Sequence, residues 1–270
     1  MDLQRYLARV GYSADPRPDI ETLRGLLRAH VGSVPFENLD VQLGRPLTTA
    51  VGDAYDKIVR RGRGGWCYEQ NGLFGWALSE IGFEVTRVAA AVMRDSMGDA
   101  AHAKHLALLV REPGGGAFLA DVGFGGGLYA PIPLCEHQAW HEPFRIGLRP
   151  LDDGYWQFWE DAGDGEFSYD FYPEVASEDA LARKCERLQT DPDSSFVLNL
   201  VVQIRAPDRH TALRGRVLTR RDAAGDEVTT LGSADQLVQV LASEFGLDLP
   251  EIADCWPKIV ERHQRLFGAG

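Results

Sequence analysis

The residue best suited to covalent chemistry is Cys67, which follows a Gly-Gly-Trp segment and precedes an apolar run. That run predicts a helix over about 67–81 that ends at Gly82. A cysteine at a helix N-terminus lies near the positive end of the helix dipole and near unpaired N–H groups, which favour the thiolate. Cys67 is therefore a candidate nucleophile, the alternative being a small buried core residue. The preceding Gly64 and Gly65 would leave room for a bound group beside the backbone.

A cysteine nucleophile needs a base, and two of the seven histidines lie close together at His102 and His105. His105 begins an apolar segment over 104–111 that predicts a strand, whereas His102 lies in the loop before it. A lone histidine in such a strand is usually a core residue, so both remain candidates. The pair spells HxxH, but no third ligand stands out, and we expect no metal site.

The partner for the base is Asp121, a carboxylate at the end of the next apolar segment, 117–122. An unpaired buried carboxylate would cost several kcal/mol, so Asp121 needs a cation or an N–H donor beside it. If 104–111 and 117–122 form a hairpin, Asp121 can lie next to His105. In the resulting relay, the sulfur of Cys67 attacks, the imidazole holds its proton and the carboxylate orients the imidazole.

A glycine-rich segment follows Asp121 and includes Gly123, Gly125 and Gly126. It follows a strand but continues into a segment with two prolines, which cannot be the helix of a dinucleotide-binding site. One interpretation is a loose turn. The other is a wall without side chains, along which a ligand backbone or phosphate could pass.

The composition is that of a globular protein, with 44% hydrophobic and 25% charged residues. The net charge of −12 argues against a nucleic-acid partner, because phosphate binding needs a basic surface. No apolar run is long enough for a membrane span, and the start lacks the features of a signal peptide. The four cysteines, at 67, 135, 185 and 255, form no CxxC pair. We expect a cytoplasmic protein with free thiols.

The remaining pattern predicts helices first, then strands, then a mixed C-terminal part. Such an order indicates an α+β fold and not a doubly wound sheet. Further helices are expected at about 2–10, 19–31, 53–61, 177–188, 233–245 and 250–266. Further strands are expected at 83–93, 144–148, 155–159, 167–172, 196–204, 217–220 and 227–231.

Four motifs together resemble the arylamine N-acetyltransferase family. They are the Arg-Gly-Gly-Trp-Cys-Tyr-Glu-Gln-Asn segment around Cys67, Val-Pro-Phe-Glu-Asn-Leu at 34–39, Asp-Val-Gly-Phe-Gly-Gly at 121–126 and His-Glu-Pro-Phe at 141–144. They occur in the family's order and spacing over essentially the whole chain, and the spacing favours His105 over His102. One departure is Trp66, where the family commonly has Tyr or Phe.

The resemblance implies a three-part architecture, with an N-terminal helical bundle at 1–82, a central β-barrel-like domain at 83–190 and a C-terminal α/β lid at 191–270. It implies acetyl-CoA as the donor and an aromatic amine or hydrazine as the acceptor, with ping-pong transfer through an acetyl-cysteine. Phe36, Tyr68 and Phe124 would line the acceptor pocket. The small residues Gly123, Gly125 and Gly126 would face CoA.

Other functions fit the same residues. Amide synthases that close polyketide macrolactams resemble this family and take a carrier-bound acyl chain, and a thiol hydrolase or transglutaminase-like enzyme would have a similar triad. A non-catalytic binding module is a fourth option, although the intact Cys, His and Asp argue against it. The sequence leaves the acceptor and the oligomeric state open, a homodimer included.

A basic stretch over 205–221 could hold an anionic ligand in this acidic chain. It contains Arg205, Arg209, His210, Arg214, Arg216, Arg220 and Arg221. One interpretation is the solvated face of a strand, as charge runs usually are. The other is that Arg209, His210 and Arg214 attract and anchor the CoA phosphates.

Overall fold

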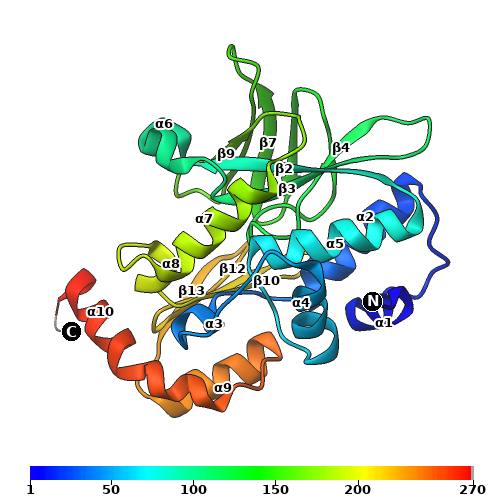
Figure 1. The fold of residues 1–270 in the computed structure, drawn as a ribbon. Coiled ribbons are helices and arrows are strands. Elements are labelled where there is room, and N and C mark those ends of the chain that lie inside the picture. Colours follow the sequence, from blue (N-terminus) through cyan, green and yellow to red (C-terminus); the bar gives the residue numbers. More distant parts are fainter. Residues whose placement is uncertain (269–270) are drawn as a thin grey trace.

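The computed structural model describes residues 1–268 and shows an α+β fold (Figure 1). Helices dominate the N-terminal third, a large antiparallel sheet follows, and a smaller antiparallel sheet lies with the C-terminal helices. All strand pairs within the two sheets are antiparallel. The predicted fold class is confirmed.

The N-terminal third is built from short helices around one long buried helix. They are α1 (Leu3–Val10), α2 (Ile20–Ser33), α3 (Leu39–Gln42), α4 (Val51–Tyr55), the π-helical turn η1 (Asp56–Arg60) and α5 (Cys67–Ile81). Helix α2 begins where expected, because the side chain of Asp19 accepts a hydrogen bond from the Thr22 N–H. Helix α5 ends at Gly82, whose φ of 107° is the left-handed conformation that glycine adopts without strain.

The large sheet has eight strands in the order β5-β4-β3-β2-β9-β8-β7-β6 and curves into a nearly closed barrel. Its strands are β2 (Glu84–Val92), β3 (His105–Arg111), β4 (Ala117–Ala120), β5 (Ile132–Pro133), β6 (His137–His141), β7 (Phe144–Pro150), β8 (Trp156–Asp161) and β9 (Phe167–Phe171). Short helices α6 (Arg94–Met97) and η2 (Gly98–Ala101) connect β2 to β3. Helix α5 packs against β2 and β3, so Gly75 lies beside Leu108.

The smaller sheet has five strands in the order β1-β10-β11-β12-β13. They are β1 (Phe36–Glu37), β10 (Val201–Arg205), β11 (His210–Arg214), β12 (Val217–Asp222) and β13 (Gly225–Thr230). Leu213 and Leu218 belong to an apolar core shared with α9 (Ala234–Phe245), η3 (Pro250–Cys255) and α10 (Trp256–Phe267). Between the two sheets in the chain come α7 (Glu178–Thr190) and α8 (Ser195–Leu198), and α7 packs onto the segment around Cys67.

The strand expected at 196–204 is wrong in its first half. Residues 195–198 form α8, and β10 begins only at Val201. Ser194 starts the helix because its hydroxyl accepts a hydrogen bond from the Phe196 N–H. The side-chain amide of Asn38 then donates to the carbonyls of Phe196 and Asn199. The Asn38 contacts come from a residue distant in the chain, so the apolar pattern could not reveal them.

The expected boundaries near 82 and 190 follow the ends of α5 and α7, and the three-part division stays a prediction. Strand β1 does not follow this division, because it belongs to the N-terminal segment but pairs with β10 in the C-terminal sheet. Residues 269–270 of the expected lid lie outside the described residues.

Candidate active site

Cys67 is the first residue of α5 and is 2% exposed. Its Sγ lies 3.9 Å from the carbonyl oxygen of Lys104. The two preceding glycines are required by packing within the protein. A Cβ on Gly64 would lie 2.1 Å from the Pro35 oxygen, and one on Gly65 would lie 2.9 Å from the Cβ of Glu69. The structure therefore explains these glycines by chain packing and not by the approach of a bound group.

His105 and Asp121 are brought together by the hairpin of β3 and β4, as the sequence predicted. His105 begins β3 and Asp121 comes directly after the last residue of β4. The His105 Nε2 lies 2.6 Å from Asp121 Oδ2, and both residues are buried. His102 is exposed in the preceding loop.

Asp121 accepts four hydrogen bonds. His105 and the Tyr169 hydroxyl (2.8 Å) donate to Oδ2, whereas the Asn71 amide (2.7 Å) and the Gly123 N–H (2.8 Å) donate to Oδ1. Burial raises the pKa of Asp121, but the charge of His105 and these hydrogen bonds outweigh it and lower the pKa. The carboxylate is therefore ionised at neutral pH.

Asn71 and Tyr169 were missed from the sequence. Asn71 has a signal that could have been used, because it lies four residues after Cys67 in α5 and is polar in an apolar helix. Tyr169 has no such signal in the sequence, because only the pairing of β9 with β2 brings it to the site. Its ring centroid lies 4.9 Å from that of His105.

The electrostatics of His105 favour the imidazolium. Burial lowers its pKa, but the charge and hydrogen bond of Asp121, followed by those of Cys67, raise the pKa to about 10. A protonated imidazole between a carboxylate and a sulfur stabilises a thiolate on the sulfur side. The arrangement can support nucleophilic attack by Cys67.

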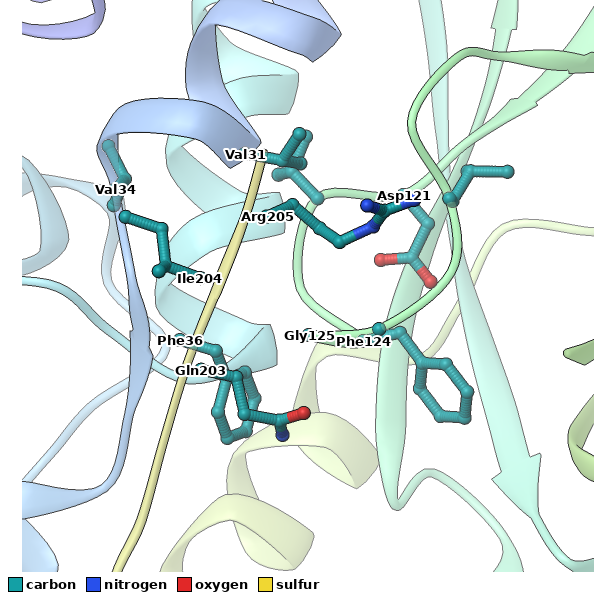
Figure 2. Close-up of a pocket in the computed structure, with 12 residues that line it drawn as sticks. Val31, Val34, Phe36, Asp121, Phe124, Gly125, Gln203, Ile204 and Arg205 are labelled. Atoms are coloured by element: carbon teal, nitrogen blue, oxygen red, sulfur yellow. The ribbon is translucent and has the colours of Figure 1, made fainter. Parts of the chain in front are cut away.

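The aromatic residues expected around the acceptor occupy two different places. Phe36 and Phe124 line a cavity of about 20 Å³, together with Asp121 and the β10 residues Gln203 and Arg205 (Figure 2). A space of this volume can hold a water molecule but not an aromatic ring. The Phe124 ring lies 5.2 Å from the His105 ring.

Tyr68 does not line this cavity. It is fully buried, and its hydroxyl donates to the Ala103 carbonyl oxygen at 2.6 Å. Its ring packs edge to face against Trp66, which in turn packs against Phe196 of α8. Trp66, the departure from the family motif, is thus accommodated in a buried aromatic cluster.

Protein atoms surround the glycines expected to face CoA. A Cβ on Gly123 would lie 2.7 Å from the Cys67 Cα, and one on Gly126 would lie 2.2 Å from the carboxylate of Glu160. Gly125 has a φ of 87°, and its carbonyl oxygen accepts a hydrogen bond from His210 Nε2. Close packing alone therefore requires glycines in this turn.

Glu160 of β8 is a buried carboxylate that the sequence did not single out. It accepts a hydrogen bond from the Gly127 N–H. Burial raises its pKa to about 7, against the effects of the Gly127 hydrogen bond and the Arg205 charge.

The basic stretch divides into buried, paired and exposed side chains. Arg205 is buried and donates to the carbonyl oxygens of Ala206 and His141, while His210 is buried against the glycine turn. Arg220 and Arg221 pair with carboxylates, and Arg216 donates to the Leu231 carbonyl oxygen. Arg209 and Arg214 are exposed.

Arg209 and Arg214 differ in position. Arg209 lies in the turn between β10 and β11, and its charge helps to lower the pKa of Glu244 on α9, after the larger effect of the Arg220 hydrogen bond. In strand β11, alternation places Arg214 on the same face as His210, whose ring reaches the glycine turn. Arg214 therefore lies on the side of the small sheet that faces the site.

Within residues 1–268, no helix is long and apolar enough to cross a membrane. The same residues contain no group of three His, Cys, Asp or Glu side chains arranged to hold a metal ion.

Comparisons with known proteins identify the family of this chain. A family model described as N-acetyltransferase matches residues 19–254. An arylamine N-acetyltransferase of Mycolicibacterium smegmatis is 39% identical and covers 94% of each chain. Arylamine N-acetyltransferase 1 of Homo sapiens is 27% identical and covers 99% of each.

Solved structures are similar to this protein over nearly the whole chain. An arylamine N-acetyltransferase from M. smegmatis superposes with a TM-score of 0.87 at 36% identity, over 97% of this chain and 98% of that one. The Mycobacterium marinum enzyme, solved in complex with CoA, superposes with a TM-score of 0.87 at 31% identity, over 98% of this chain and 99% of that one. The chain belongs to the arylamine N-acetyltransferase family.

Proposed function

We propose that this protein transfers an acetyl group from acetyl-CoA to arylamines and arylhydrazines through an acetyl-Cys67 intermediate. The observation that supports this most directly is the 2.6 Å contact of His105 with the buried carboxylate of Asp121, which together with Cys67 raises the pKa of His105 to about 10. The name of the M. marinum structure, which includes CoA, supports the choice of donor.

In the first half-reaction, the Cys67 thiolate attacks the acetyl carbonyl carbon, and the bond from that carbon to the CoA sulfur breaks. The proton on His105 goes to the departing CoA sulfur. In the second half-reaction, the amine nitrogen attacks the acetyl-cysteine, neutral His105 takes the amine proton, and Cys67 leaves as a thiolate. Asp121 orients His105 and stabilises its charge in both steps.

Substrate contacts are part of the same proposal. Phe36 and Phe124 border the acceptor, with Tyr68 supporting the aromatic cluster behind Cys67. Arg214, on the face of β11 that carries His210, attracts the CoA phosphates, and Arg209 adds to the field from the end of the sheet.

The test is intact-protein mass spectrometry after the protein is mixed with acetyl-CoA in the absence of an amine. We expect one acetyl group on Cys67, which disappears when an arylamine is added. Cys67→Ser is the control, because a hydroxyl is far less acidic than a thiol and the variant should remain unmodified. No adduct on the wild-type protein would refute the proposal. An adduct that water removes as fast as an amine would indicate a thiol hydrolase instead.

A further inference from the structure

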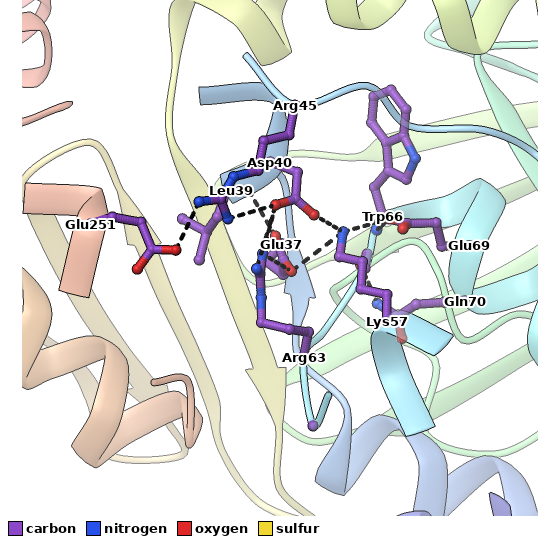
Figure 3. Close-up of polar contacts among 12 residues, drawn as sticks. Glu37, Leu39, Asp40, Arg45, Lys57, Arg63, Trp66, Glu69, Gln70 and Glu251 are labelled. Carbon is purple, nitrogen blue, oxygen red and sulfur yellow. Dashed lines mark hydrogen bonds and ion pairs between the residues drawn. The ribbon is translucent and has the colours of Figure 1, made fainter. Parts of the chain in front are cut away.

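Five charged side chains form a buried network beside the start of the helix that carries Cys67 (Figure 3). All five are buried, and they come from β1, α3, η1, the segment before Cys67 and α5 itself. The members are Glu37, Asp40, Lys57, Arg63 and Glu69. Three carboxylates face these two buried cations, and the half-exposed Arg45 lies 3.6 Å from Asp40 Oδ1 at the edge of the network.

Lys57 is the centre of this network. Its Nζ lies 3.0 Å from both Glu69 Oε2 and Asp40 Oδ2, and 3.5 Å from Glu37 Oε1. Burial lowers the pKa of Lys57, but the three carboxylates together raise it, so the ammonium stays charged. Lys57 reaches this position from the π-helical turn η1, a rare geometry that is frequent at functional sites.

Glu69 connects Lys57 to the nucleophile. The Glu69 Oε2 that meets Lys57 also accepts a hydrogen bond from the backbone N–H of Trp66, at 3.2 Å. Trp66 is the residue before Cys67, and its N–H has no partner within the helix. The contact therefore holds the backbone from which Cys67 projects. Gly65 leaves the space for it, since a Cβ there would lie 3.0 Å from Glu69 Oε2.

We propose that Lys57 and Glu69 form a positioning pair for the nucleophile, in which Lys57 orients Glu69 and Glu69 holds the start of the helix under Cys67. The inference rests on the proposed role of Cys67 and goes beyond it, because neither side chain takes part in acetyl transfer. The pair also contributes to the charge around Cys67, because Glu69 lies two residues after it in α5.

The groups around the pair define its response to pH. Burial raises the pKa of Glu69 to about 7, Lys57 lowers it and Glu37 raises it. Cys185 of α7 lies near Cys67 and Glu69, and burial followed by the charges of these two residues raises the pKa of its thiol. Cys185 thus stays neutral, and Lys57 and Glu69 control the local charge.

The experiment measures the rate of Cys67 alkylation by iodoacetamide against pH in Lys57→Met, Glu69→Gln and the double variant. Lys57→Met leaves three carboxylates with Arg63 and the half-exposed Arg45, neither of which contacts Glu69. We therefore expect the midpoint of the profile to move to higher pH and the rate at pH 7 to fall about tenfold. Glu69→Gln keeps an acceptor for the Trp66 N–H and removes a negative charge, so its midpoint should move to lower pH. The double variant restores the charge balance, and its rate should return to within about threefold of wild type.

Arg220→Met is the matched control. Arg220 also bridges two carboxylates, Glu227 and Glu244, but it faces α9 and not the site. It should lower the melting temperature and leave the alkylation profile unchanged.

A Lys57→Met profile equal to that of Arg220→Met would overturn the inference, as would a double variant no better than Lys57→Met. If Lys57→Met does not fold, an unmoved profile in Glu69→Gln would overturn it equally. Alkylation needs neither acetyl-CoA nor an amine. A missing acetyl adduct therefore refutes the proposed function, and an unmoved profile refutes this pair.

Discussion

Replacing Asp121 by Asn tests the charge arrangement of the site with almost no change in shape. An amide can keep the donors from Asn71 and Gly123 on its oxygen, while its NH₂ group faces His105 and Tyr169. The Tyr169 hydroxyl can rotate to accept a hydrogen bond from this NH₂ group, and His105 Nε2 must also accept one from it. The imidazole proton must move to Nδ1, on the other side of the ring, so His105 loses the ability to take a proton there.

The magnitude follows from the pKa of His105, which rises from 6.5 to about 10 in the folded protein. That rise of about 3.5 units corresponds to roughly 5 kcal/mol in favour of the imidazolium. Because the folded pKa is raised, this stabilisation is fully present below pH 6.5 and is lost as the pH rises through 10. Without the Asp121 charge, burial dominates and His105 is neutral at pH 7.

The assay is the pH dependence of Cys67 alkylation, followed by intact-protein mass spectrometry. An ordinary thiol is only about 3% ionised at pH 7, so we expect roughly a 30-fold slower alkylation in Asp121→Asn. Acetylation by acetyl-CoA should fall by about 10³-fold or more, because the wrong tautomer also blocks proton transfer. Asp170→Asn, a buried carboxylate on β9 paired with Arg94, is the control. An unchanged profile in Asp121→Asn would refute the assigned role of Asp121.

Three further predictions concern single side chains. His105→Ala should abolish acetylation of Cys67, and His102→Ala should leave most of it; the reverse result, in the same mass assay, would exchange their roles. The pKa of Glu160 is raised from 4.5 to about 7, so its protonated form stabilises the folded state. This contribution to the free energy of unfolding, about 3 kcal/mol, is fully present below pH 4.5 and is lost as the pH rises through 7. In denaturant unfolding at pH 5 and pH 8, the stability of Glu160→Gln should therefore change less with pH than that of the wild type. An equal change in both proteins would contradict this prediction. Arg214→Glu should raise the KM for acetyl-CoA and leave acetylation by an aryl acetate ester, which has no phosphates, near wild type. Equal losses with both donors would indicate damaged folding.

The sequence by itself determined the local features of this protein. Asp19 caps α2 and Gly82 ends α5 because side-chain capping and a left-handed glycine act within one turn of the chain. The apolar run after Cys67 and the continuous apolar segment that follows His105 were sufficient to predict α5 and β3. Such patterns depend only on near neighbours, so they can be read without the fold.

Tertiary structure decided which distant groups meet. Tyr169 reaches Asp121 only through the pairing of β9 with β2, and β1 joins β10 across most of the chain. The sequence did not predict strand β11, because its charged residues interrupt the apolar pattern of a strand. The strand is stabilised by pairing with β10 on one side and β12 on the other.

The buried charges show most clearly what the sequence alone could not predict. Lys57 and Glu69 have no distinguishing local pattern in the sequence, yet burial and three carboxylates around one ammonium determine their properties. Arg209 and Arg214 look alike in the sequence, but one lies near Glu244 and the other on the face towards the site. Charge interactions depend on distance and burial in three dimensions, and these quantities exist only after the chain has folded.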